Sequence, residues 1–411
     1  MKIKTFTTLI ATAFLFCSCG GGGNRQATAA NNETNETTVV ETIEIVPTDP
    51  VIIDIVGNLE NKRESRLSDF GSSVRYIRLQ PPPGVEFRLG IQNVLSDDEH
   101  IIIKTWQGLF LYAADGTFLS SIFETDLEMD GGVFRTRSGF LFPSGDLLNG
   151  KLLFRTTEEG VEGFNILDIA NLSENANLQP TFQRSLPSGI DRGFWTRYFL
   201  IDEHSYFVTE SLTAMSIQSG DTLFRIHNYY RPTFTASNVP IVPTSSYRIN
   251  GKLMMQIAHN DTVFALTPPN RVEPAFVMEW GEFRSDMNRR ANGLPQNDRF
   301  LLQNWVETQH HIFIEYSKGD GRNAPRHRAI FDKEAKTLTH HTTPTLLFEN
   351  NIDPVGMPFF PQGINHRGEM YMFFSKEQVQ QQIATGKFNN SRLQTLYNRM
   401  PDGSFYLMIV R

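Results

Sequence analysis

Short runs of β-forming residues, separated by turn residues, recur from about residue 51 to the last residue of this 411-residue chain. Each recurring unit contains a strand, a polar turn, a second strand, a looser turn, a third strand, a hairpin and a fourth strand. In the unit that starts at Val94, the hairpin signal is the dipeptide Asp115-Gly116. Comparable units begin near Phe199, Tyr247 and Trp305. Four antiparallel strands per unit are typical of a β-propeller blade, so the pattern predicts an all-β chain with that fold.

The number of blades follows from the spacing of these units. The segment from Leu141 to Ile169 and the segment after Gly363 supply two further units, which gives six four-stranded blades of about 60 residues each. A closed ring pairs its first and last strands in one blade, and residues 74–79 and 405–410 are the expected partners. Two packed β-sandwiches would need a domain boundary, and a β-helix would need a much shorter repeat.

The composition favours the same fold class. The chain contains 32 Phe, 30 Gly and 21 Pro with a charged fraction of 20%, which suits many short strands joined by turns better than long helices. One helix is expected, over residues 376–384, and Gly386 would end it.

The N-terminus has the features of a bacterial lipoprotein signal. Lys2 and Lys4 precede an apolar stretch over residues 7–16, which is too short to cross a bilayer as a helix. Ser18 then places a small residue directly before Cys19, as in signals whose cysteine becomes diacylated. We therefore expect cleavage before Cys19 and a lipid on its sulfur, with ordinary cleavage and no lipid as the alternative.

Three parts are expected along the chain: a lipoprotein signal peptide over residues 1–18, a flexible tether over 19–50 and the six-bladed propeller domain over 51–411. The tether is rich in Gly, Asn, Thr and Glu, a composition that does not support a packed core. The lipid would attach the protein to the membrane of the cell envelope. We expect an outer-membrane anchor with the body in the periplasm, and exposure at the cell surface is the alternative.

The charge of the chain limits the class of partner. The formal net charge is −7, and no run of Lys and Arg of the nucleic-acid-binding type occurs. Nucleic acid is therefore excluded as an expected partner. A glycan, a peptide or an envelope protein fits the exported location.

Several structural motifs resemble a known family. Leu67-Ser68-Asp69-Phe70 is followed by Val74, Tyr76, Ile77 and Leu79, and the later motifs are Asn260-Asp261-Thr262-Val263-Phe264 and Phe331-Asp332-Lys333-Glu334. Together they resemble the six-bladed β-propeller lipoproteins of Bacteroides-type bacteria, a family of domains of unknown function. The resemblance implies the propeller fold and the envelope location, and it implies no reaction.

Metal and nucleophile motifs are absent from the sequence. His310-His311 and His340-His341 are adjacent pairs, and in a strand each pair offers only one side chain to a given face. The chain has no H-E-x-x-H, C-x-x-C or G-x-S-x-G motif. We therefore expect no metal site and no cofactor, and no catalytic residue is assigned.

Acidic residues recur at equivalent places in successive units: Asp97, Asp98, Glu99, Asp202, Glu203 and Glu307. Such recurrence favours a role in turns, because Asp satisfies turn backbones locally. A propeller can also bring distant carboxylates together on its axis, so an envelope carbohydrate-active hydrolase or lyase is the alternative function. Two or more convergent carboxylates with perturbed pKa values would favour the enzyme.

Aromatic and basic residues are the best candidates for ligand contact. The candidate ligand-binding residues are Trp106, Trp195, Trp305, Arg289 and Arg290. Tryptophan stacking beside polar side chains suits carbohydrate or peptide binding. The alternative is that the tryptophans fill the core between blades. The sequence therefore predicts a binding or interaction module that recognises a glycan, a peptide or a partner protein.

Overall fold

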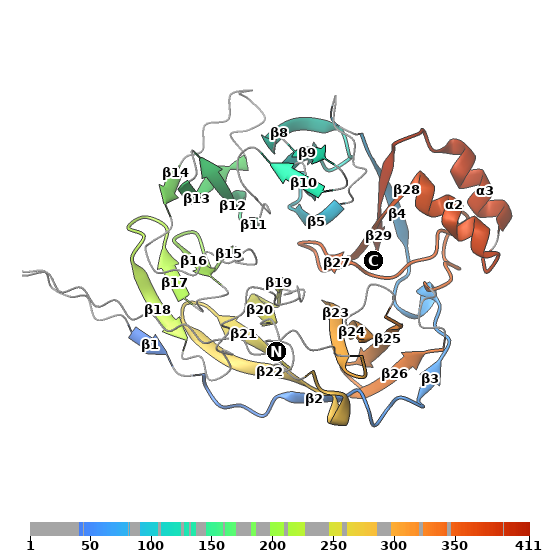
Figure 1. Cartoon of the computed structure of the whole chain (residues 1–411), viewed down its shortest axis with the longest axis horizontal. Helices are drawn as coiled ribbons and strands as arrows, with labels where there is room; N and C mark the ends of the chain where they lie inside the picture. Colours follow the sequence, from blue (N-terminus) through green and yellow to red (C-terminus); the bar gives the residue numbers. More distant parts are fainter. Residues whose placement is uncertain are drawn as a thin grey trace, which may run out of the picture. The chain divides into compact units, whose positions relative to one another are not determined.

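Six sheets follow one another along the chain and form the blades of a β-propeller (Figure 1). The computed structural model describes residues 41–43, 45–80, 82, 91–105, 108–124, 127–130, 133–136, 145–158, 161–169, 182–185, 198–208, 213–226, 246–256, 261–285, 297–319, 324–342, 347–388 and 390–411. All of them belong to one unit of the chain, Val40–Arg411. The predicted six-bladed, all-β propeller is confirmed.

Each blade is an antiparallel meander that starts with its innermost strand. The first blade contains β5 (Ile91–Ser96), β6 (His100–Thr105), β7 (Gly108–Ala113) and β8 (Phe118–Glu124). The second contains β11 (Gly145–Leu148), β12 (Lys151–Glu158), β13 (Val161–Asp168) and β14 (Phe182–Ser185). The third contains β15 (Tyr198–Leu200), β16 (Ser205–Val208), β17 (Thr213–Ser216) and β18 (Thr222–Ile226). The fourth and fifth contain β19 (Ser246–Ile249), β20 (Lys252–Gln256), β21 (Thr262–Thr267), β22 (Arg271–Glu279); and β23 (Phe300–Glu307), β24 (His311–Lys318), β25 (Arg326–Asp332), β26 (Thr337–His341).

The sixth blade closes the ring with strands from both ends of the chain. It contains β27 (Gly363–Ile364), β28 (Met370–Ser375), β29 (Phe405–Val410) and, as its outermost strand, β4 (Val74–Leu79). Strands β29 and β4 pair antiparallel, with Val410 opposite Val74 and Phe405 opposite Leu79. The expected closure by residues 74–79 and 405–410 is therefore confirmed.

The N-terminal segment, residues 41–79, runs along the outer edges of four blades, and we call it the strap. Its strands β1 (Glu41–Ile43), β2 (Val51–Asp54) and β3 (Lys62–Arg63) pair parallel with β18, β22 and β26. Blades three to five therefore have five strands instead of the expected four. Figure 1 shows this blue segment passing outside β22 and β26. Strand β1 lies within residues 19–50, the segment expected to be a tether.

The strap is attached by alternating side chains of β2 and the residues that follow. Ile53 and Ile55 are completely buried in a core shared by blades four and five, while Ile52 on the opposite face is 48% exposed. The strap also covers backbone groups that an uncovered edge strand would expose.

Two helices follow β28, where one was predicted. Helix α2 (Lys376–Thr385) has Ser375 as its N-cap, with Gln378 completing a capping box, and it ends at Gly386 in the left-handed region. This confirms the expected helix over residues 376–384. Helix α3 (Asn390–Arg399) was not predicted, and it packs Leu393 into the same core as α2. No helix in the described part of the chain has the length and apolar character needed to cross a membrane.

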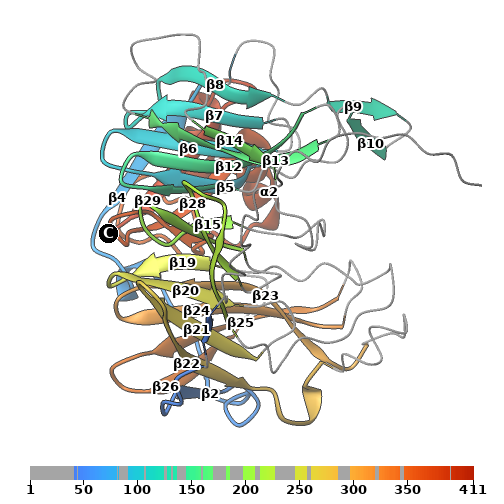
Figure 2. The ribbon, with the colours of Figure 1, turned by 90° about the vertical axis from the view of Figure 1, so that its left-hand side faces the viewer.

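A few short elements lie outside the main strands of the blades. A two-stranded hairpin, β9 (Leu127–Asp130) and β10 (Val133–Thr136), follows the first blade and lies beyond the ends of its strands in Figure 2. Two 3-10 turns, η1 (Leu67–Asp69) and η4 (Gly281–Phe283), complete the described elements.

Candidate functional site

The innermost strands of all six blades, β5, β11, β15, β19, β23 and β27, line one cavity of about 630 Å³. These strands surround the centre of the propeller in Figure 1. We call this space the axial cavity. Its volume is in the range of small-ligand sites in proteins.

A buried ion pair joins three blades at the wall of the axial cavity. The Asp146 carboxylate on β11 accepts hydrogen bonds from Arg248 Nη1 at 2.8 Å and Nη2 at 2.5 Å, and from the backbone N–H of Leu200 at 2.8 Å. Asp146 is 4% exposed. Both oxygens of this carboxylate are therefore committed to neighbouring strands, and a bidentate pair of this kind fixes the position of the arginine.

A second network surrounds Glu307 at the end of β23. Lys333 Nζ donates to Glu307 Oε1 at 2.6 Å, and the Tyr247 hydroxyl donates to Oε2 at 2.6 Å. The Trp305 indole N–H donates in turn to Tyr247 Oη at 2.7 Å. Burial and the adjacent Glu307 carboxylate raise the pKa of Tyr247 well above its ordinary value, so this tyrosine stays a donor.

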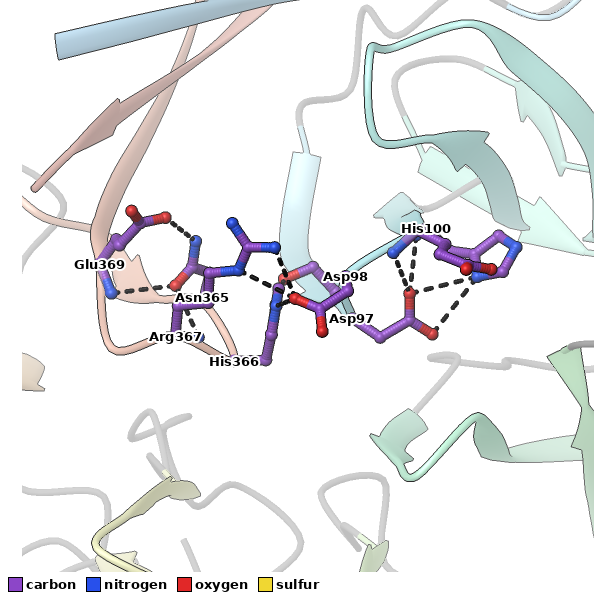
Figure 3. Close-up of polar contacts among 9 residues, drawn as sticks. Asp97, Asp98, His100, Asn365, His366, Arg367 and Glu369 are labelled. Carbon is purple, nitrogen blue, oxygen red and sulfur yellow. Dashed lines mark hydrogen bonds and ion pairs between the residues drawn. The ribbon is translucent and has the colours of Figure 1, made fainter.

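A polar cluster joins blades one and six at the rim of the axial cavity (Figure 3). Asp98 Oδ1 accepts from Arg367 Nε at 2.9 Å, from Arg367 Nη2 at 2.5 Å and from His366 Nε2 at 3.0 Å. Hydrogen bonds lower the pKa of Asp98, and those from Arg367 have a larger effect than the one from His366. The other ring nitrogen of His366, Nδ1, lies 3.0 Å from Ser96 Oγ. Asp98 is thus held as a carboxylate by a cation from the neighbouring blade.

Two of the acidic residues of the repeating units, Asp97 and Asp202, stabilise turns, as the sequence suggested. Asp97 Oδ1 accepts the backbone N–H groups of Glu99 at 2.9 Å and His100 at 2.7 Å. Asp202 Oδ1 accepts the backbone N–H of His204 at 2.8 Å in the third blade. Glu307 differs, because its partners are side chains of its own and the neighbouring blade.

Most candidate ligand-binding residues from the sequence lie outside the described residues: Trp106, Trp195, Arg289 and Arg290, together with the lipidation candidate Cys19. Trp305 is described. It is 2% exposed, packs against Phe276 and belongs to the core between blades four and five. This is the core-filling role that the sequence left open as the alternative for the tryptophans. Trp305 is also one of the residues that line the axial cavity.

The structure adds site residues that sequence reasoning missed. Arg248 and His366 each line the axial cavity from an isolated position in a strand or turn. No motif or regular spacing marks either residue, because their partners come from other blades. Within the described residues, no group of three or more His, Cys, Asp or Glu side chains could hold a metal ion.

Comparisons with known proteins agree with this fold. Residues 40–385 match the family model described as a domain of unknown function, DUF4933. A search of curated proteins found no match. The structure is similar to that of an exported protein of Bacteroides fragilis, with a TM-score of 0.54, 12% identity, and coverage of 88% of this chain and 99% of that one. A Bacteroides thetaiotaomicron protein of unknown function has a TM-score of 0.42 and 10% identity, over 85% of this chain and 74% of that one.

Proposed function

The chain belongs to the DUF4933 family, and we propose that it is a lipid-anchored binding propeller of the cell envelope whose axial cavity binds a glycan. The observation that carries this proposal is the axial cavity itself, to which the innermost strand of every blade contributes. The propeller positions the polar groups of this wall on rigid strands, which favours a preformed site.

Unused donors on the cavity wall support a glycan as the ligand. The amide oxygen of Asn93 accepts a hydrogen bond from Tyr371 Oη at 3.1 Å. The amide oxygen of Gln362 accepts one from the Phe373 backbone N–H at 2.9 Å. Their amide nitrogens make no hydrogen bond to a described residue, and neither does the buried Ser246 hydroxyl. Sugar hydroxyls both donate and accept, so they can satisfy such groups.

The charge of the cavity also suits a sugar backbone. Of the four described carboxylates that line it, three pair with a cation: Asp98 with Arg367, Asp146 with Arg248 and Glu307 with Lys333. The fourth, Asp97, stabilises its own turn. Because three of these four negative charges are compensated by a partner cation, the described cavity wall has little excess charge with which to attract a highly charged ligand.

The same pairing argues for binding over the alternative, an axial-carboxylate hydrolase or lyase. A general acid in glycoside hydrolysis needs a raised pKa, whereas the pKa of Asp98 is lowered. Among the described residues of the axial cavity, the contact of His366 with both Ser96 and Asp98 is the arrangement that favours catalysis. If the protein turns over a bound glycan and His366→Ala abolishes that turnover, the function is catalysis and the binding proposal is wrong.

The envelope location is part of the proposal. Cys19 would carry the lipid, and the chain after it would connect the anchor to the strap. An exported protein with the same fold supports this location. Metabolic labelling with an alkyne fatty acid should mark the wild-type protein and leave Cys19→Ala unlabelled. Equal labelling of both would refute the anchor, and protease treatment of intact cells distinguishes a periplasmic body from a surface-exposed one.

A glycan array followed by calorimetry tests the binding proposal. The mature chain carrying Cys19→Ser should bind a subset of glycans, and Gln362→Ala should weaken binding by about tenfold, as loss of a hydrogen bond in the site predicts. Gln394→Ala is the matched control, because Gln394 is an exposed glutamine on α3. Trp106→Ala, Trp195→Ala, Arg289→Ala and Arg290→Ala test the sequence candidates that lie outside the described residues. The proposal fails if no glycan binds, or if Gln362→Ala and Gln394→Ala behave alike.

A further inference from the structure

A second cavity, of about 370 Å³, lies between blades five and six, and we call it the side pocket. It is lined by parts of β23, β24, β25 and β28 and by residues 360–362. Asn304, Gln362 and Tyr371 line both the side pocket and the axial cavity. The two spaces therefore adjoin, and one extended ligand can occupy both.

The side pocket has an excess of positive charge. The one carboxylate among its described lining residues, Glu315, is buried and faces two arginines, with Arg326 Nη1 at 2.6 Å from Oε1 and Arg328 Nη2 at 2.8 Å from Oε2. Among the described lining residues, two guanidinium groups share one carboxylate, so positive charges outnumber negative charges by one. This differs from the axial cavity, whose described lining carboxylates outnumber the cations that pair with them.

The two arginines are placed differently. The Arg328 side chain is 13% exposed, and its guanidinium lies 4.1 Å from the centre of the Phe360 ring. The Arg326 side chain is 56% exposed, and its single hydrogen bond among the described residues goes to Glu315. A guanidinium carries five N–H donors in a planar fork, so Arg326 can bind a second anion while it keeps this contact.

The Gln362 amide provides a further donor at the junction. Its oxygen accepts the Phe373 backbone N–H, so its amide nitrogen is available to either cavity. A guanidinium and an amide donor that line the same pocket can both donate to an anionic group attached to a sugar ring.

We propose that the side pocket binds the anionic group of an acidic glycan whose neighbouring sugars occupy the axial cavity. The anion is a carboxylate, as in a hexuronic acid, or a sulfate ester, since both present oxygens to a guanidinium fork. This inference rests on the proposed glycan-binding function and specifies the class of glycan.

Calorimetry with matched trisaccharides tests the inference. The probes end in glucuronic acid, in glucose or in glucose 6-sulfate, on each backbone linkage that the array identifies. At least one of the two acidic probes should bind about tenfold more tightly than the glucose probe, as one charge-assisted contact predicts. Which acidic probe binds more tightly identifies the anion. Added salt should weaken binding of the acidic probes and leave the neutral probe unchanged.

Arg326→Gln should abolish the preference for the acidic probes and leave the affinity for the neutral probe unaltered. The variant retains the Glu315–Arg328 pair, so the buried Glu315 carboxylate still has a cation beside it. Arg271→Gln is the control, because Arg271 is 60% exposed and shares Glu273 with Lys252, an equivalent arrangement on the outer strand β22. This control should keep the acidic preference.

The outcomes separate the two proposals. Binding of neutral and acidic probes with equal affinity overturns the acidic-glycan inference and leaves the glycan-binding function in place. An acidic preference that survives in Arg326→Gln places the anion elsewhere and also overturns the inference. Failure of every probe and of the whole array overturns the glycan-binding function itself.

Discussion

Docking of the strap through β2 makes a quantitative prediction for two neighbouring isoleucines. Ile53 is completely buried, whereas Ile52 is 48% exposed on the same strand. Ile53→Ala removes about three buried carbon groups, at about 0.8 kcal/mol each, and the cavity left behind adds to this cost. We expect a loss of about 3 kcal/mol in the free energy of unfolding. Ile52→Ala should cost less than about 0.5 kcal/mol.

Urea unfolding followed by tryptophan fluorescence measures this difference, because Trp280 and Trp305 belong to the same core as Ile53. With a slope of about 3 kcal/mol per molar urea, the midpoint of Ile53→Ala should fall by about 1 M. The midpoint of Ile52→Ala should stay close to that of the wild type. Equal midpoints for the two variants would refute the docking of β2 against blades four and five.

Two further predictions concern buried polar groups. Arg248→Met leaves the Asp146 carboxylate buried without its cation, so the free energy of unfolding should fall by about 3–5 kcal/mol. Replacement of an exposed arginine, such as Arg271→Met, should cost less. A smaller loss for Arg248→Met than for Arg271→Met would contradict the pairing. Burial lowers the pKa of His340 below its ordinary value of 6.5. Below about pH 6.5, this histidine is therefore protonated more in the unfolded chain than in the folded chain. The free energy of unfolding should therefore decrease as the pH is lowered from 7 to 5, and His340→Gln should flatten this dependence in urea titrations; an unchanged slope would argue against a buried neutral imidazole.

The blades were predictable because their information is local. Alternating apolar residues and turn dipeptides such as Asp115-Gly116 specify hairpins within one blade. The closing strands were predictable because a ring must pair its ends. Helix α2 also carries local signals, since Ser375 and Gln378 form a capping box and Gly386 ends the helix.

The strap and α3 lacked such signals. Parallel pairing of β1 with β18 joins residues that are far apart in the sequence, and β1 is only three residues long. Helix α3 presents a mostly polar surface around the buried Leu393, so its apolar stripe is narrow. Both elements depend on tertiary contacts, which a single sequence does not specify.

The site residues were hidden for the same reason. Asp146 and Arg248 are 102 residues apart, and only the ring of blades brings them together. The turn role of Asp97 was predictable, because its partners are the next few backbone N–H groups. The partner of Asp98 was not, since Arg367 comes from the sixth blade.

Hydrogen exchange of the chain with and without a glycan from the array tests the central claim most directly. Binding in the axial cavity should slow amide exchange in the innermost strands and their turns, above all over residues 91–98, 246–249 and 362–367. Amides of the strap should exchange at unchanged rates. Protection confined to the strap or to the outer strands, with no change in the innermost strands, would contradict binding in the axial cavity.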